Sequence, residues 1–218
     1  MKKILPIIIA AFLMGAGCGA PKSAEIDVPF TPQAPQGDWS QPWQDACEET
    51  SIYMVASFYA DDPIKREEAV QRIREIFKVK NETIKVSRDE SLETIAKLID
   101  ELEMPWTTDL KVDPTAEDLK AELAAGRPII VPVYEPALKN PLYSAEYHVL
   151  VLTGYDDEKG QFIVNDPGTK SGEGLRFDQD IFMAAIHDLN PQDKDAGRKA
   201  VLFTRQDDWR EWLESLAP

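Results

Sequence analysis

Apolar side chains recur at every third or fourth position through much of the first half of the chain, which is the spacing of one helix face. Leu92, Ile95, Leu98 and Ile99 are the clearest example. Asp45 directly precedes another such segment and is a residue type that caps helix starts. The spacing predicts four helices, over residues 47–60, 64–80, 91–103 and 115–125.

Runs of branched apolar residues replace this spacing in the second half, and such runs are typical of buried strands. They predict strands over residues 128–134, 148–155, 161–165 and 199–204. The turn-forming segment DDEKG at 156–160 predicts that the second and third of these strands form a hairpin. Helices followed by strands predict an α+β fold, with N-terminal helices packed on an antiparallel β-sheet.

The chain begins with two lysines, an apolar run and a stretch of small residues, a layout typical of a secretory signal peptide over residues 1–17. The segment GAGC at 15–18 resembles a bacterial lipoprotein cleavage site, which makes Cys18 the lipidated first residue of the mature protein. We therefore expect an exported protein that Cys18 anchors on the extracytoplasmic side of the membrane. The alternative is an ordinary signal peptide and a secreted protein.

Three regions are expected after the signal peptide. Residues 19–38 contain several prolines and few large apolar groups, which suits a tether, and we expect that tether over residues 18–26. The main domain is expected over 27–205, followed by a C-terminal helix over 206–218.

Composition limits the partners. The chain carries 39 Asp and Glu against 24 Lys and Arg, a formal net charge of −15, and a nucleic-acid partner is excluded because phosphate backbones are bound through Lys and Arg. Two Cys and two His at wide spacing do not form a zinc site of four close ligands, and no metal or organic cofactor is implied. We expect a monomer whose partners are a peptide or protein substrate and the membrane.

If Cys18 is lipidated or removed, Cys47 is the only thiol left in the mature chain, so no internal disulfide forms. Cys47 falls at the start of a predicted helix, where free N–H groups and the helix dipole stabilise a thiolate. Glu48 and Glu49 oppose this if they face the sulfur. The same position also suits a buried, unreactive thiol.

A nucleophilic thiol needs a base, and the chain has two histidines. His148 is the first residue of a predicted strand, whereas we expect His187 to be a surface or capping residue. If the hairpin turn centres on position 157, Asp166 lies opposite His148 and can orient its ring. The developing oxyanion needs donors as well, and the Cys47 backbone N–H is one of them. A glutamine side chain is the usual second donor, and four glutamines precede the thiol: Gln33, Gln36, Gln41 and Gln44.

Several sequence blocks together resemble the peptidase family C thirty-nine-like domains of the papain-like cysteine peptidase clan. They are VPFTPQ at 28–33, ACEETS at 46–51, GRPIIV at 126–131, HV at 148–149, GY at 154–155 and NDP at 165–167. The resemblance covers about residues 27–205 and implies a papain-like fold. It also implies Cys47 as nucleophile, His148 as base, Asp166 as the orienting acid and Gln33 as the oxyanion donor.

The chain differs from the family pattern in one place and leaves one assignment open. Many members have Gly directly after the Cys, whereas this chain has Glu48. The spacing found in papain itself would assign the oxyanion donor to Gln41 instead of Gln33.

We therefore expect a thiol-dependent hydrolase, a cysteine peptidase that cleaves peptide or isopeptide bonds outside the cytoplasm. Two alternatives use the same scaffold differently. In the first, the acyl-enzyme is captured by an amine, as in a transglutaminase-like acyltransferase. In the second, the domain is a catalytically inactive binding module at the cell surface, with a buried and unreactive Cys47.

Overall fold

A computed structural model describes residues 21–85, 88–140 and 145–206. Five α-helices lie in the described residues: α1 (Cys47–Tyr59), α2 (Arg66–Val79), α3 (Leu92–Glu101), α4 (Ala116–Ala124) and α5 (Gln179–Ala185). A π-helical turn, η2 (Lys80–Ile84), continues α2, and short 3₁₀ turns cover η1 (Trp43–Asp45), η3 (Glu135–Leu138) and η4 (Lys194–Ala196). None of the helices in the described part of the chain is long and apolar enough to cross a bilayer.

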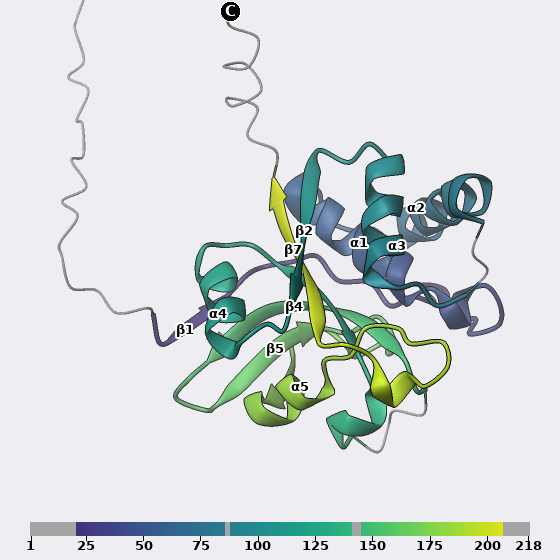
Figure 1. Cartoon of the computed structure of the whole chain (residues 1–218). Helices are drawn as coiled ribbons and strands as arrows, with labels where there is room; N and C mark the ends of the chain where they lie inside the picture. The colour runs from purple at the N-terminus through teal and green to yellow at the C-terminus, as the bar shows by residue number, and fades with distance from the viewer. Residues whose placement is uncertain (1–20, 86–87, 141–144, 207–218) are drawn as a thin grey trace, which may run out of the picture.

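Seven strands form one antiparallel sheet (Figure 1). Their bounds are β1 (Ser23–Glu25), β2 (Trp106–Val112), β3 (Ile129–Val133), β4 (His148–Asp156), β5 (Gln161–Asn165), β6 (Leu175–Asp178) and β7 (Ala200–Gln206). The spatial order is β2-β7-β3-β4-β5-β6, and β1 pairs with β4 outside this path. The expected α+β fold with helices packed on an antiparallel sheet is confirmed.

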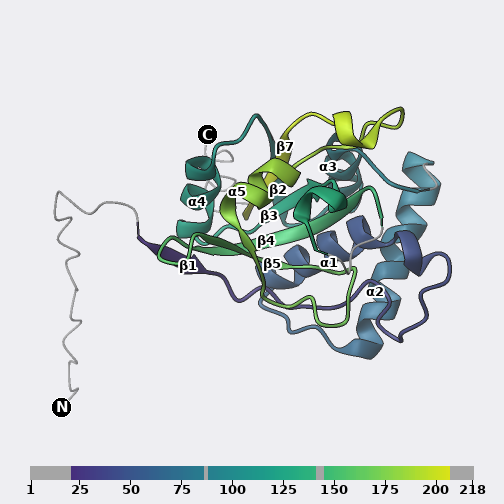
Figure 2. The same cartoon turned by 90° about the horizontal axis from the view of Figure 1, so that it is seen from below.

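Both faces of the sheet are covered by helices. Along β4, Val149 and Val151 pack on one face, while Leu150 and Leu152 pack on the other. The first face carries α1, α2 and α3, and the second carries α4 and α5 (Figures 1 and 2). Because alternate residues of a strand point to opposite faces, a strand covered on both sides must be apolar throughout. This explains the continuous apolar runs in the sequence.

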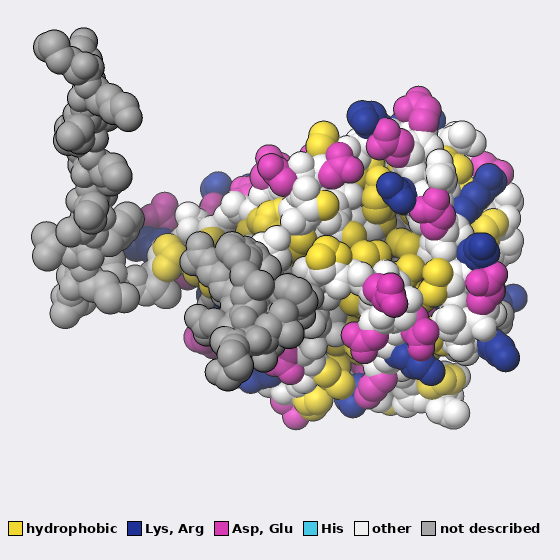
Figure 3. Space-filling model, turned by 90° about the horizontal axis from the view of Figure 1, so that it is seen from above, with side chains coloured by type: hydrophobic (Ala, Val, Ile, Leu, Met, Phe, Trp, Pro, Cys, Tyr) yellow, Lys and Arg dark blue, Asp and Glu magenta, His cyan; other side chains and the backbone are white. Residues whose placement is uncertain are grey.

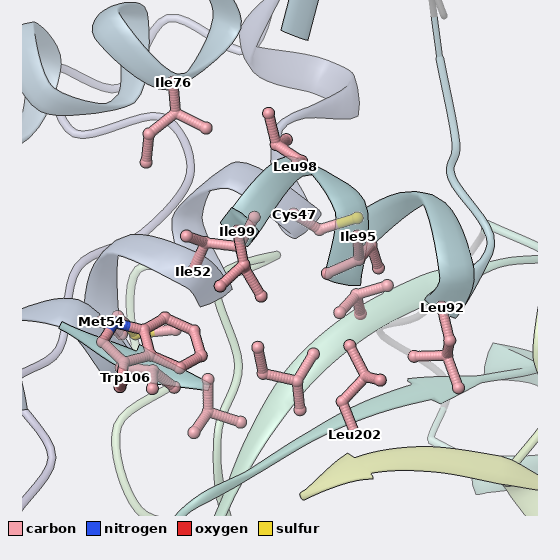
Figure 4. Packing of buried hydrophobic residues seen from close by; sticks show 14 of the residues in the cluster. Cys47, Ile52, Met54, Ile76, Leu92, Ile95, Leu98, Ile99, Trp106 and Leu202 are labelled. Atoms are coloured by element: carbon pink, nitrogen blue, oxygen red, sulfur yellow. The ribbon is translucent and has the colours of Figure 1, made fainter. Parts of the chain in front are cut away.

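The helical spacing of α3 places its apolar side chains in the first core. Leu92, Ile95, Leu98 and Ile99 are at most 1% exposed and pack with Trp106 and Leu202 (Figure 4). Full burial of one such aliphatic side chain contributes about 1.5–3 kcal/mol. Cys47 belongs to the same cluster, so the helix that carries the thiol is fixed by the core itself.

Several expectations need correction. The tether expected over 18–26 is wrong for its last residues, because Ser23–Glu25 forms β1 and pairs with β4. Strands β2 and β6 were not expected, and β2 lies between α3 and α4, so the helices do not all precede the sheet. The signal peptide, Cys18 and nearly all of the C-terminal helix expected over 206–218 lie outside the described residues.

Charged side chains of both signs are interspersed on the molecular face shown in Figure 3. Ion pairs such as Lys65–Glu68 and Arg72–Glu75 are exposed at the molecular surface. On this face the acidic excess is therefore a solvated surface of mixed charge, and the carboxylates that matter for chemistry lie inside the molecule.

Candidate active site

Cys47 is the first residue of α1, and its helix start has no side-chain cap. Ala46 occupies the cap position, so the side chain that would satisfy the first N–H groups is missing. The expectation that Asp45 caps this helix is wrong, because its carboxylate accepts a hydrogen bond from Gln41 instead. The positive end of the helix dipole is thus left facing the region of the sulfur. Cys47 itself is 5% exposed.

His148 and Asp166 are hydrogen-bonded to each other. The His148 Nε2 atom lies 2.6 Å from Asp166 Oδ1, which also accepts the N–H of Gly168 at 2.7 Å. Burial alone would lower the pKa of His148, but the charge and hydrogen bond of Asp166 outweigh it and raise that pKa. With Nε2 bound to the carboxylate, Nδ1 is the ring nitrogen that remains for the thiol.

The predicted hairpin is confirmed, but its register was wrong by two residues. Val151 pairs with Asn165, whereas the expected pairing of 148 with 166 would have placed Val151 opposite Ile163. An irregularity between Leu152 and Gly154 separates this part of the ladder from the turn. A shift of two residues keeps the side chains on the same face, so His148 reaches Asp166 diagonally.

Cys47 and His148 line the same cavity of about 370 Å³. The sulfur lies against β4 next to His148, since the backbone N–H of Val149 is within hydrogen-bonding reach of it. Trp39 and Gly168 form other parts of the wall. The structure thus brings together at one cavity three segments that lie far apart in the sequence: the start of α1, the start of β4 and the loop after β5.

Gln33 also reaches this cavity, but its amide is already engaged. Both N–H groups at Nε2 are used, one on the carbonyl of Trp43 at 2.9 Å and one on that of Gln44 at 2.8 Å. The alternative donor, Gln41, is exposed and bonded to Asp45. Gln33 therefore braces the loop that leads to Cys47, and its role as oxyanion donor stays a prediction. Such a role requires the amide to leave one of the two carbonyls.

The sequence singled out Glu48 as a departure from the family pattern, and its side chain does face the sulfur. The Cys47 thiol donates to Glu48 Oε2 at 3.0 Å, and Glu48 Oε1 accepts the backbone N–H of Glu90 at 3.1 Å. Burial raises the pKa of Cys47 well above its usual value, and the charge and hydrogen bond of Glu48 raise it further. The nearby N–H of Val149 acts in the opposite direction.

Glu48 belongs to a buried charged cluster that we call the glutamate cluster: Glu48, Glu49, Glu90 and Lys80. The Lys80 Nζ atom bonds Glu90 Oε1 at 2.6 Å and forms a second, very close ion pair with Glu49. Burial, together with the charge of Glu49, raises the pKa of Glu90 to about 7. Oxygens of the three carboxyls lie within 4.8 Å of one another, a spacing that suits a metal ion. Lys80 already provides the cation for two of them.

Two glycines that shape the site were missed in the sequence. A Cβ atom on Gly168 would lie 3.0 Å from the His148 ring, and one on Gly172 would lie 1.8 Å from the carbonyl oxygen of Asp166. The Asp166 N–H in turn donates to the Gly172 carbonyl at 2.9 Å. The only available signal was their position close after the NDP segment.

His187 lies elsewhere, as expected. It is half-buried, its Nδ1 atom lies 3.1 Å from the carbonyl oxygen of Ala185, and its ring packs edge-on against Tyr134. It does not line the cavity that Cys47 and His148 share.

A thiol at a helix start, a histidine on the facing strand and an α+β architecture together define a papain-like cysteine peptidase fold. The model of the Peptidase_C39 like family matches residues 25–186, and the chain belongs to that family. The resemblance drawn from the sequence blocks is therefore confirmed.

Solved structures to which the chain is similar are distant in sequence. One, described as a candidate C39-like peptidase from Bacillus anthracis, has a TM-score of 0.54 and 17% identity, and the match covers 83% of this chain and 96% of that one. Another, the cysteine protease xylellain from Xylella fastidiosa, has a TM-score of 0.49 and 13% identity, with 87% of each chain covered. No curated protein matches the chain.

Proposed function

We propose that this protein is a cysteine peptidase that hydrolyses peptide or isopeptide bonds through Cys47, His148 and Asp166. One observation carries the proposal: Cys47 and His148 share a cavity, and Asp166 holds the far nitrogen of the His148 ring. Membership of the peptidase family supports the same reading.

The proposed reaction begins when the Cys47 thiol gives its proton to His148 Nδ1. The thiolate then attacks the carbonyl carbon, and a C–S bond forms while the carbonyl oxygen becomes an oxyanion. The backbone N–H of Cys47, at the uncapped start of α1, is the donor we assign to that oxyanion. His148 next gives its proton to the leaving amine as the C–N bond breaks.

Hydrolysis of the thioester completes the cycle. His148 takes a proton from a water molecule, which attacks the acyl carbon and releases the acid together with the free thiol. Throughout the cycle Asp166 keeps the ring oriented and favours its protonated form, which matches the raised pKa of His148.

The charges around the cavity favour a cationic substrate. Its wall carries four acidic residues and two basic ones, namely Asp45, Asp89, Glu135 and Glu146 against Arg88 and Lys194. Lys194 is already paired with Asp89 at 3.0 Å. Since like charges are repelled at such a surface, we expect peptides with a lysine or a free amine beside the scissile bond to be preferred.

We also propose that the reaction takes place outside the cytoplasm, with the domain held at the membrane by a lipid on Cys18. The signal-peptide pattern of residues 1–17 supports this location. Fractionation of cells that make the full chain or its Cys18→Ser variant tests it. The variant is expected to leave the membrane fraction.

The activity is tested with a mixture of peptides that differ only in the charge beside one scissile bond. The full chain is expected to cleave the lysine-containing peptides fastest, and Cys47→Ala is expected to abolish cleavage. Cys18→Ser, which removes the other thiol, serves as the matched control and should keep cleaving.

Product analysis of the same reactions separates the alternatives. Free acid products support hydrolysis, whereas products joined to an added amine support acyl transfer. If the full chain cleaves no peptide and Cys47→Ala binds peptides as well as the unmodified chain does, the proposal is wrong and a binding module is the better description.

A further inference from the structure

Glu48 is in direct contact with the sulfur that the proposed reaction uses as its nucleophile. The thiol donates its hydrogen bond to Glu48 at 3.0 Å, whereas the His148 ring is hydrogen-bonded to Asp166. Among the contacts of the described residues, no hydrogen bond joins the sulfur to the His148 ring. In this state the Cys47 thiol therefore donates its hydrogen bond to a carboxylate and not to the expected base.

Glu48 is held firmly in that position. Its side chain is fully buried, and its second oxygen accepts the backbone N–H of Glu90. A neutral carboxyl can still accept that N–H, although an ionised carboxylate accepts it more strongly. A change in the charge of Glu48 therefore leaves the carboxyl beside the sulfur and alters only its effect on the thiol.

The glutamate cluster also determines which carboxyl takes up a proton first. It contains three carboxyls and one ammonium, so full ionisation leaves two uncompensated negative charges in a buried site. The ammonium of Lys80 contacts Glu49 and Glu90, and its described ion pairs do not include Glu48. The negative charge of Glu48 is thus the one that the Lys80 ammonium neutralises least. Burial raises the pKa of Glu48 well above the usual value.

We propose that Glu48 controls the nucleophile: as a carboxylate it holds Cys47 as a neutral thiol, and when protonated it allows the thiolate to form. In the ionised state, a second negative charge on the sulfur 3.0 Å away is strongly disfavoured. In the protonated state, the hydroxyl of Glu48 donates to the sulfur and stabilises the thiolate, while the thiol proton passes to His148. This control deepens the proposed function, on which it rests for the role of Cys47.

Other ionisable groups surround this contact on every packed element. They are Cys47 and Glu49 on α1, Lys80 on η2, Asp89 and Glu90 before α3, Tyr147 before β4, and His148 on β4. Tyr147 donates its hydroxyl to the Glu90 carbonyl at 2.8 Å, and burial, followed by the charge of Glu48, raises its pKa well above the usual value. Within this group, Glu48 is the residue bonded to the thiol.

The test compares the full chain with Glu48→Gln, which has the same shape, cannot ionise and can donate to the sulfur. Iodoacetamide alkylates Cys47 across the pH range, and mass spectrometry of the Cys47 peptide separates its rate from that of Cys18. The quantity measured is the rate for Glu48→Gln divided by the rate for the unmodified chain. It should be close to one at about pH 5 and rise to at least about tenfold at about pH 8.5.

Glu49→Gln is the matched control, because it makes the same neutral change one residue further along, on a side chain bonded to Lys80. Its rate ratio should change much less with pH, because Lys80 compensates the charge of Glu49 and that charge raises the pKa of Cys47 less than the charge of Glu48 does. The ultraviolet absorbance of the thiolate, with Cys47→Ser as blank, reports the same ionisation without requiring reagent to enter the cavity. A ratio for Glu48→Gln that is flat with pH in both readouts, or a slower reaction, overturns the proposal.

The outcome is distinguishable from a failure of the proposed function. If the chain cleaves no peptide but the ratio rises with pH, Glu48 controls a reactive thiol whose reaction is something else. If the chain cleaves peptides and the rate ratio for Glu48→Gln does not change with pH, the proposed peptidase activity is supported and the proposed control by Glu48 is wrong.

Discussion

Removing the ammonium of Lys80 isolates the energetic importance of the glutamate cluster. Lys80 is 2% exposed and forms ion pairs with Glu49 and Glu90, whose side chains are fully buried. In Lys80→Met the aliphatic stem keeps its packing, but the two carboxylates lose their cation. Loss of one partner from a buried pair costs about 3–5 kcal/mol, since the remaining charge stays buried without compensation.

The size of this loss depends on pH. The pKa of Glu90 is already raised to about 7, and without Lys80 nearby it rises further, so in acid the carboxyls of the variant are neutral. We therefore expect the full loss of unfolding free energy at about pH 8 and a clearly smaller loss at about pH 5. Urea unfolding of both proteins at the two pH values measures it.

Lys65→Met is the matched control. Lys65 pairs with Glu68 at 2.9 Å, but the two side chains are 64% and 48% exposed, so the same substitution should cause no measurable loss. If Lys80→Met lowers the unfolding free energy by less than about 1 kcal/mol at the higher pH, the carboxyls of Glu49 and Glu90 are neutral even when Lys80 is present. The charge argument for the glutamate cluster would then be wrong.

Three further predictions concern the site. Gly168→Ala places a Cβ atom against the His148 ring, and the displaced ring should lower kcat/KM for peptide cleavage at least about tenfold, while the urea midpoint shows whether the fold survives. Asp166→Asn keeps an acceptor for the ring but removes the charge, so the pKa of His148 should fall in an NMR titration. Glu90→Gln should flatten the fall in stability as pH rises from about 4.5 to about 7. A raised carboxyl pKa means that the folded state binds the extra proton in that window, so stability is lost there as pH rises.

Regular patterns made much of the fold predictable. The strand predicted over 161–165 has the same bounds as β5, and the DDEKG turn places the hairpin correctly. The register was harder to predict: the observed pairing differs by two residues from the expected one, and an irregularity between Leu152 and Gly154 that shifts the ladder by one residue leaves no mark in composition. The expectation that His148 and Asp166 lie on the same face of the sheet still holds, because a shift by an even number of residues does not change the face.

Edge elements were harder to predict than central ones. Strand β2 reads WTTDLKV, with apolar residues at only three of seven positions, because just part of it is buried. Strand β1 is three residues long and lies in a segment whose composition suits a tether. Each is fixed by a long-range partner, β7 for β2 and β4 for β1, which local sequence patterns do not reveal.

The candidate site was predictable in its main residues and not in its surroundings. Cys47, His148 and Asp166 follow from residue type and position, and the structure brings them to one place. Buried Glu48 and Lys80 resemble solvated surface charges in the sequence, because nothing local signals that α1, η2 and the segment before α3 enclose them. The use of both Gln33 N–H groups on backbone carbonyls likewise becomes visible only in three dimensions.

The proposed reaction requires the thiol of Cys47 to give its proton to the imidazole of His148. It is tested most directly by the rate at which iodoacetamide alkylates Cys47 in the full chain and in His148→Ala at about pH 6, well below the ordinary thiol pKa of about 8.5. We expect the variant to react at least about tenfold more slowly, because its thiolate has lost the imidazolium that stabilises it. Equal rates in the two proteins would contradict it.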